Sequence, residues 1–156
     1  LDKYKKQIEN GLNAELLVYN EIMKNIDKKV LANELGKKLG TEKFGEINNK
    51  LEQLIHYSKN FDKYAPFDLL STRGQELVYI EVKSTTGNEI YFSKSELQFA
   101  YYHIDNYLVK VVKDGEIYDL LLNDIVFEYF ELKSQIDSWL IDTIRVKIDF
   151  SSSTIN

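Results

Sequence analysis

The sequence predicts a single α/β domain. Residues 4–25 repeat apolar side chains at the helical period, whereas 67–71, 77–84 and 107–112 are short runs rich in the aliphatic and aromatic residues that favour strands. The 156 residues match the size of one ordinary domain, and 44% of them are hydrophobic. One proline and seven glycines leave no long flexible linker. We therefore expect one folded unit over residues 1–156.

The first predicted element is a helix over about residues 4–25. Its apolar stripe recurs at spacings of three, four and seven residues and comprises Ile8, Leu12, Tyr19, Ile22 and Ile26. Glu15 falls inside this stripe, where a carboxylate is costly unless it has a partner or a ligand. Two interpretations stay open: Glu15 lies at the edge of the stripe and pairs with a lysine, or it serves a site.

The next predicted elements are helices and then strands. Residues 27–53 are rich in lysine and glutamate, which indicates a helical insertion with a solvated outer face. Leu54–Tyr57 is a candidate first strand. The runs 67–71 and 77–84 are joined by a hairpin-like connection, and 89–92 predicts a further short strand.

The second half of the chain begins with a helix-start signal. Ser93 followed by Glu96 has the spacing of a capping box and predicts a helix that ends near Ile104. A strand over 107–112 follows. The remainder predicts one or two strands and a short helix, with 144–148 alternating as a strand does.

The charge is unevenly distributed. The net charge is −5, and residues 114–156 carry nine acidic residues against three basic ones, so most of the excess lies in an acidic C-terminal extension. This balance argues against a protein that coats nucleic acid non-specifically. The first two-thirds of the chain is nearly neutral, and a site there remains able to meet a polyanion.

Several classes of site and location are excluded by composition. The chain has no cysteine, which excludes disulfide scaffolds and thiolate metal sites and fits a reducing cytoplasm. No stretch approaches the roughly 20 apolar residues of a membrane span, and the first residues are no signal peptide. No phosphate-binding glycine loop and no nucleophile elbow occurs. We expect a cytoplasmic protein with no membrane partner.

The chemistry-bearing feature is the segment Tyr79–Lys83. Alternate residues of a strand share a face, so Ile80 and Val82 should point into a core while Glu81 and Lys83 point the other way. By itself such a triplet is common on solvent-facing strands. Asp68 favours a functional site over a solvent-facing strand, because aspartate is a poor strand former and lies here in an otherwise apolar run. A hairpin would place Asp68 beside Glu81.

A cluster of carboxylates beside one ammonium suits a hard divalent cation. Mg²⁺ takes oxygen ligands, keeps several waters and is commonly held by one or two carboxylates plus a substrate phosphate. It polarises phosphoryl oxygens and lowers the pKa of a bound water. The neighbouring carboxylates should raise the pKa of Lys83, which favours an ammonium that stabilises charge over a neutral base. Without metal the cluster should repel a polyanion.

These residues resemble the PD-(D/E)XK nuclease superfamily, which has the restriction-endonuclease-like fold. More narrowly, the chain resembles the domain of unknown function at the C-terminus of the plant NO VEIN protein. The similar stretches lie within about residues 8–112 and are Gly11–Val18, Pro66–Leu69, Tyr79–Thr85, Phe92–Leu97 and Tyr107–Val111.

The resemblance implies a central mixed β-sheet flanked by helices, with a metal site and a catalytic lysine. Asp68 and Glu81 match the metal ligands, and Lys83 matches the catalytic lysine. Glu15 matches the acidic residue of the first helix, and we expect it to be the third metal ligand of the catalytic site. Glu96 matches an acidic position that opens a later helix, where we favour helix capping over chemistry. The segments 27–53 and 114–156 have no clear counterpart.

Other candidate residues favour structural roles. His56 and His103 share no metal-ligand spacing, which favours core or surface positions. Tyr101, Tyr102 and Tyr107 are candidates for base stacking, but the spacing favours a buried Tyr102 and a partly exposed Tyr101. Arg73, at the hairpin tip, is more readily a solvated turn residue than a phosphate contact.

We therefore expect an Mg²⁺-dependent endonuclease domain that hydrolyses DNA phosphodiester bonds, with Mn²⁺ as a substitute ion, as a module of a restriction or defence system. The alternatives are an inactive nuclease-fold module that binds nucleic acid or a protein, and a purely structural interaction domain. Expected partners are nucleic acid, DNA foremost, and either a second copy of the chain or further domains of a longer protein.

Overall fold

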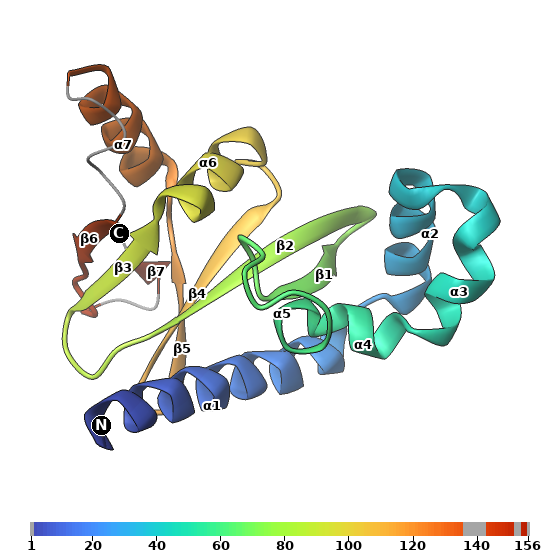
Figure 1. The fold of residues 1–156 in the computed structure, drawn as a ribbon, viewed down its shortest axis with the longest axis horizontal. Coiled ribbons are helices and arrows are strands. Elements are labelled where there is room, and N and C mark those ends of the chain that lie inside the picture. Colours follow the sequence, from blue (N-terminus) through green and yellow to red (C-terminus); the bar gives the residue numbers. More distant parts are fainter. Residues whose placement is uncertain (1, 136–142, 152–153, 156) are drawn as a thin grey trace.

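A five-stranded mixed sheet with helices on both faces forms the centre of the fold (Figure 1). The computed structural model describes residues 2–135, 143–151 and 154–155. In chain order its elements are α1 (Asp2–Asn25), α2 (Lys28–Leu39), the 3₁₀ helix η1 (Thr41–Lys43), α3 (Phe44–Asn49), α4 (Leu51–Ile55), α5 (Tyr57–Asn60), β1 (Leu69–Arg73), β2 (Glu76–Ser84), β3 (Glu89–Ser93), α6 (Lys94–Tyr102), β4 (Tyr107–Lys113), β5 (Glu116–Leu120), α7 (Asn123–Gln135), β6 (Thr143–Lys147) and β7 (Thr154–Ile155).

The main sheet has the strand order β1-β2-β4-β5-β7. Strands β1 and β2 form an antiparallel hairpin, β2 and β4 are parallel, and β4 and β5 form a second antiparallel hairpin. The parallel pair requires a crossover, which runs through β3 and α6. Strand β3 is not part of the main sheet and pairs with β6 in a separate two-stranded sheet. The predicted α/β fold with a central mixed sheet flanked by helices is confirmed.

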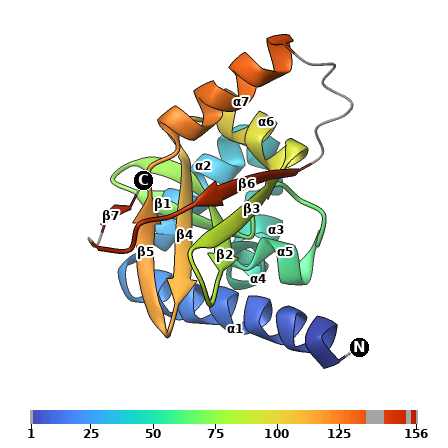
Figure 2. The same ribbon diagram turned by 90° about the vertical axis from the view of Figure 1, so that its left-hand side faces the viewer.

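Helix α1 covers one face of the sheet, as the two views in Figures 1 and 2 show. Its buried residues Ala14 and Val18 pack in one cluster with Val78, Ile80 and Val82 of β2. The predicted alternation of β2 is therefore correct. The opposite side of β2 faces α6, where the ring centroids of Tyr79 and Phe99 lie 4.9 Å apart.

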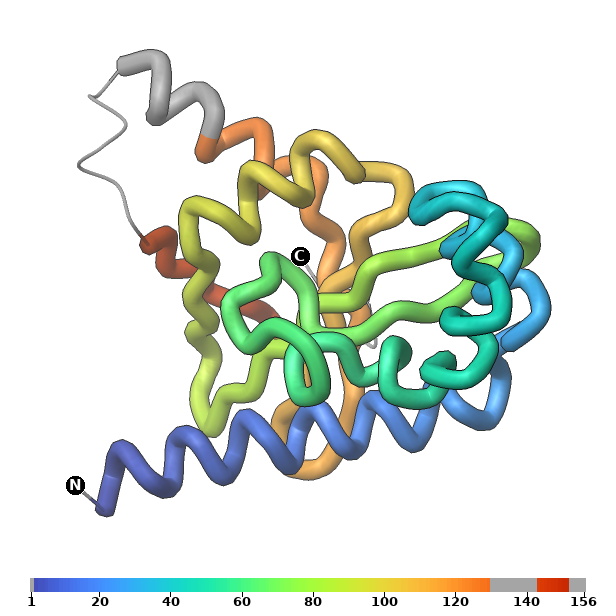
Figure 3. The backbone as a smooth tube through the Cα atoms, turned by 45° about the vertical axis from the view of Figure 1, so that its right-hand side comes forward, coloured from blue at the N-terminus to red at the C-terminus, as the bar shows by residue number. Residues whose placement is uncertain are grey.

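Helices α2–α5 gather beside the β1–β2 hairpin, as Figure 3 shows. The predicted insertion over 27–53 is thus helical. Its apolar side is buried, with Leu31 and Ile47 in the same core as the sheet, while its lysines and glutamates lie largely exposed. This segment packs against the strand that begins after Asp68.

The prediction of a strand over Leu54–Tyr57 is wrong. Residues 51–55 form α4 and residues 57–60 form α5. Leu51 and Ile55 are one helical turn apart, and both are buried. A run of four mostly apolar residues fits either a strand or a helix, and the spacing to Leu51 decided for the helix.

The acidic segment 114–156 supplies part of the sheet system. Strands β5 and β7 extend the main sheet, and β6 pairs with β3. Asp114 and Gly115 have φ values of 52° and 78°, which is the backbone of a tight turn between β4 and β5. Among the described residues, no helix is both long and apolar enough to cross a membrane.

Candidate active site

The end of the β1–β2 hairpin brings Asp68 and Glu81 together. The register of the hairpin pairs Leu69 with Ile80, so Asp68 and Glu81 are the next residues along the two strands. The Asp68 amide donates to the Ile80 carbonyl at 2.8 Å, and Asp68 Oδ2 accepts from the Val82 amide at 2.8 Å. Asp68 is thus the residue just before β1, which begins at Leu69. Its side-chain oxygen, rather than a backbone carbonyl, accepts the hydrogen bond of the Val82 amide.

Lys83 lies between two carboxylates on the α6 side of the sheet. Its Nζ is 3.4 Å from Glu81 Oε1 and 2.8 Å from Glu96 Oε1. Glu96 Oε1 also accepts from the Ser93 amide at 2.8 Å, and Ser93 Oγ accepts from the Glu96 amide. The predicted capping box is confirmed. The same oxygen of Glu96 caps α6 and holds Lys83, a second contact that the sequence did not indicate.

Glu15 reaches the cluster from α1. Its Oε1 is 3.2 Å from His56 Nε2 and accepts from Ser58 Oγ at 2.6 Å. The Ser58 amide donates to the Asp68 carbonyl at 3.0 Å. Within the described residues Glu15 contacts a buried histidine and a serine rather than the lysine of the first interpretation. Its service in a site, the second interpretation, stays a prediction.

Burial dominates the electrostatics of the paired carboxylates. Burial, followed by the nearby charge of Glu15, raises the pKa of Asp68 from 3.8 to about 7. Burial and the charge of Asp68 raise the pKa of Glu81 well above its usual range. Two carboxylates this close disfavour each other's ionised form, so the pair holds protons that a cation would displace.

The Lys83 ammonium is stabilised by its neighbours. Burial alone would lower its pKa, but the charges of Glu81 and Glu96 raise it above the usual 10.5. This is the direction that the sequence led us to expect. For Glu96, burial raises the pKa, but Lys83 and the hydrogen bonds prevail and lower it. Tyr107 lies beside the cluster, donates to the Pro66 carbonyl at 2.7 Å, and has a raised pKa because it is buried near these carboxylates.

The donor set fits a divalent cation with two protein carboxylates. Glu81 Oε2 is buried and has no hydrogen-bond partner within the described residues, which is costly for a carboxylate oxygen. Over the same residues, no three histidine, aspartate or glutamate side chains are grouped so that they could hold a metal ion, so Glu15 does not join Asp68 and Glu81 as a third ligand. Two carboxylates are what an ion such as Mg²⁺, which keeps several waters, commonly takes from a protein.

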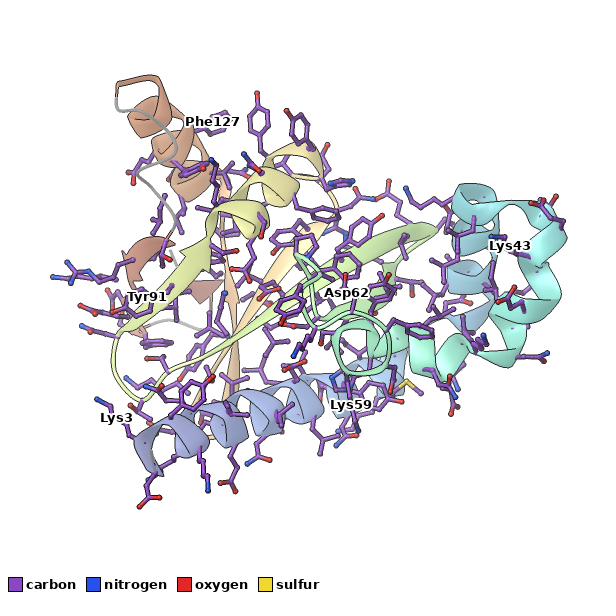
Figure 4. All side chains as sticks on the ribbon, in the orientation of Figure 1. Lys3, Lys43, Lys59, Asp62, Tyr91 and Phe127 are labelled. Atoms are coloured by element: carbon purple, nitrogen blue, oxygen red, sulfur yellow. The ribbon has the colours of Figure 1, made fainter. Side chains whose placement is uncertain are left out.

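An open cleft of about 780 Å³ begins at Lys83. It lies between the first half of α1 and the segment from the end of β2 to β3. Figure 4 labels Lys3 on α1 and Tyr91 on β3. Most of its polar lining is uncharged, from Gln7, Asn10, Asn13, Ser84, Thr85 and Thr86. Lys83 thus belongs both to the buried carboxylate cluster and to a surface that a large substrate can reach.

The remaining candidates occupy structural positions. His103 stacks on Phe99 at 4.0 Å and contacts its carbonyl, which confirms a core role. The prediction of a buried Tyr102 is wrong: it is 78% exposed at the end of α6, beyond the turn that packs on the sheet. Arg73 is exposed beside the β1–β2 turn, as predicted, and its guanidinium also donates to the carbonyl of Asp105.

Comparison with known proteins gives one family. The profile of the C-terminal domain of protein NO VEIN matches residues 15–118, about two-thirds of the chain. That range contains all the cluster residues named above and runs through the helices α2–α5. No curated protein and no solved structure matches the chain.

Proposed function

The chain belongs to the family of the NO VEIN C-terminal domain, and from this premise and the geometry of its cluster we propose that it is a metal-dependent nuclease domain. It would hydrolyse phosphodiester bonds of DNA, with the restriction-endonuclease-like fold of the PD-(D/E)XK superfamily. The observation that carries the proposal is the side-by-side placement of two carboxylates, the half-buried Asp68 and the buried Glu81, next to Lys83.

Asp68 and Glu81 would hold Mg²⁺ or Mn²⁺. The support is the unpartnered Glu81 Oε2 and the raised pKa of both carboxyl groups, since a bound cation would relieve both. When bound, such an ion supplies Lewis-acid polarisation of a phosphoryl oxygen and a water of lowered pKa. Glu15, held by His56 and Ser58, would add negative charge beside Asp68.

Lys83 would stabilise charge on the phosphate that is attacked. It is an ammonium, because two carboxylates hold its pKa high, and a group that stays protonated cannot accept the proton of the attacking water. Its position between Glu81 and Glu96 fixes the Nζ atom beside the proposed metal ligand Glu81, and the residue also lines the cleft. Lys83 would therefore orient the substrate and neutralise developing charge, as preorganised cations do in such sites.

The cleft supports a nucleic-acid substrate with a metal-dependent approach. The cluster has four carboxyl groups, Glu15, Asp68, Glu81 and Glu96, against one ammonium, so even with Asp68 and Glu81 protonated the metal-free cluster keeps a negative charge and repels a polyanion. Binding of a divalent cation reverses part of that field. DNA affinity should therefore be higher in Mg²⁺ than in EDTA, and equal affinity in both would contradict the proposal.

Isothermal titration with Mn²⁺ tests the metal site directly. The wild type should bind the ion, and Asp68→Asn should bind it at least about tenfold more weakly. Removing a group that only orients a metal ligand already weakens metal affinity by about this factor, and removing the ligand itself should weaken it at least as much. Asp62→Asn, on the exposed loop before β1, is the matched control and should bind normally. Normal affinity in Asp68→Asn would contradict the proposed site. Salt-dependent DNA binding without cleavage would instead identify a binding module that has lost catalysis.

A further inference from the structure

Two polar side chains, one between α4 and α5 and one in the first turn of α5, enter the carboxylate cluster. His56 and Ser58 lie more than 40 residues from Glu15 in the sequence, yet both contact its Oε1. The segment that carries them follows the helices α2–α4, which pack on β1 and β2. These helices thus deliver two hydrogen-bonding groups to the cluster, in addition to covering the core.

Ser58 connects Glu15 with the residue Asp68. Its Oγ donates to Glu15 Oε1 at 2.6 Å, while its amide donates to the Asp68 carbonyl at 3.0 Å. The charge of Glu15 is close enough to Asp68 to raise the pKa of Asp68, so the two carboxylates repel when both are ionised. Ser58 therefore holds the Glu15 side chain and the Asp68 backbone in a fixed relation despite this repulsion.

His56 fixes Glu15 from the other side. The residue is 6% exposed, and its ring stacks on Tyr19 at a centroid distance of 5.4 Å. Its Nε2 lies 3.2 Å from Glu15 Oε1, the oxygen that also accepts from Ser58. The stack on an α1 residue one turn from Glu15 sets the orientation of the imidazole ring, and the ring in turn sets the orientation of the carboxylate.

We propose that His56 and Ser58 are positioning residues that hold Glu15 and Asp68 in the arrangement needed to bind the divalent cation. This inference rests on the proposed function, because it concerns the same metal site. Groups that orient metal ligands from behind contribute substantially to metal affinity, and their removal typically weakens it about 10- to 100-fold. The loss should arise although neither side chain need touch the ion.

Paired variants separate positioning from packing. Ser58→Ala removes the hydroxyl, whereas Ser58→Thr retains it. His56→Phe keeps a ring against Tyr19 but loses the nitrogen, whereas His56→Gln keeps an N–H donor and loses the ring. Ser71→Ala and His103→Phe are matched controls, since Ser71 is buried on β1 and His103 stacks on Phe99, both outside the cluster.

The experiment is Mn²⁺ titration of each folded full-length variant, with the side-chain carboxyl ¹³C resonances of the metal-free protein as a second readout. We expect Ser58→Ala and His56→Phe to weaken Mn²⁺ binding at least about tenfold. Ser58→Thr and His56→Gln should restore most of the affinity, and the two controls should match the wild type. Ser58→Ala should also shift the Glu15 and Asp68 carboxyl resonances, whereas Ser71→Ala should not.

The two readouts distinguish failure of this inference from failure of the proposed function. If the wild type binds Mn²⁺ and Ser58→Ala and His56→Phe bind it equally well, the positioning role is overturned and the metal site stands. If the wild type binds no Mn²⁺, the proposed function fails and this inference fails with it. Unmoved Glu15 and Asp68 resonances in Ser58→Ala overturn the inference whether or not the ion binds.

Discussion

Asp68→Asn should make the metal-free protein more stable at pH 8, although it removes a residue that the proposed function requires. Burial, and then the charge of Glu15, raises the pKa of Asp68 from 3.8 to about 7. At pH 8 the wild type must therefore keep an ionised carboxylate where the fold favours a neutral group. Asparagine is neutral and nearly the same shape, and its side-chain oxygen can still accept from the Val82 amide.

The magnitude follows from the size of the shift. Each pKa unit corresponds to about 1.4 kcal/mol, so a shift of about three units limits the effect to about 4 kcal/mol. The folded-state pKa of this acid is raised, so its stabilising contribution is complete below about pH 4. That contribution is lost as the pH rises through about 7. The wild type should therefore lose stability between pH 4 and pH 8, and Asp68→Asn should lose less.

Urea unfolding in EDTA at pH 5, 6, 7 and 8 measures this difference. We expect the two proteins to converge at low pH and Asp68→Asn to be the more stable at pH 8. Saturating Mn²⁺ should stabilise the wild type but not the variant, because only the wild type retains the ligand. An Asp68→Asn protein that is less stable than the wild type at pH 8, with the same pH slope, would refute the reasoning.

Three further changes probe the elements that support the site. Lys83→Met should destabilise the protein by about 3 kcal/mol at pH 8, because Glu81 and Glu96 lose the cation that pairs with both; thermal and urea unfolding measure it. Ser93→Ala should lower the free energy of unfolding by about 1 kcal/mol, since α6 loses its N-cap, and urea unfolding measures this loss. Gly115→Ala should cost about 1 kcal/mol, because the φ of 78° strains any side chain, and thermal unfolding measures it.

Each of these changes has an outcome that would contradict it. Lys110→Met is the control for Lys83→Met, because the partner of Lys110, Asp119, is exposed. An equal loss of unfolding free energy in the two variants would show that burial of the ion pair does not determine how much its loss destabilises the protein. An unchanged stability in Ser93→Ala would exclude the capping box as a support of α6. A neutral Gly115→Ala would mean that the β4–β5 turn relaxes to another backbone conformation.

The elements that sequence periodicity could predict are those with one dominant pattern. The helix over about 4–25 and the alternation along 77–84 were both confirmed. The predicted apolar stripe of the helix was wrong in its first half, since Ile8 and Leu12 are about half exposed and the buried face passes through Ala14 and Val18. The segment Leu54–Tyr57 was predicted wrongly, since four residues cannot separate the two periods. Tyr102 was placed in the core because the apolar pattern of α6 continues past the point where the helix leaves the sheet.

The site was partly predictable for a related reason. Asp68, Glu81 and Lys83 lie on one hairpin, so local geometry was enough to bring them together. His56 and Ser58 contact Glu15 only through tertiary packing, because more than 40 residues separate them from it in the sequence. A regular spacing in the sequence cannot predict such a contact. The capping role already accounted for Glu96 at its position, so nothing in the sequence indicated its ion pair with Lys83.

Cleavage of plasmid and single-stranded DNA with Mg²⁺ or Mn²⁺ tests the central proposal most directly, with Lys83→Ala compared with the wild type. The account predicts cleavage by the wild type that is abolished by EDTA and by Lys83→Ala, with the variant still folded and still binding Mn²⁺. Cleavage that persists in EDTA, or in Lys83→Ala at the wild-type rate, would contradict it, and so would a folded, metal-bound wild type that cuts neither substrate.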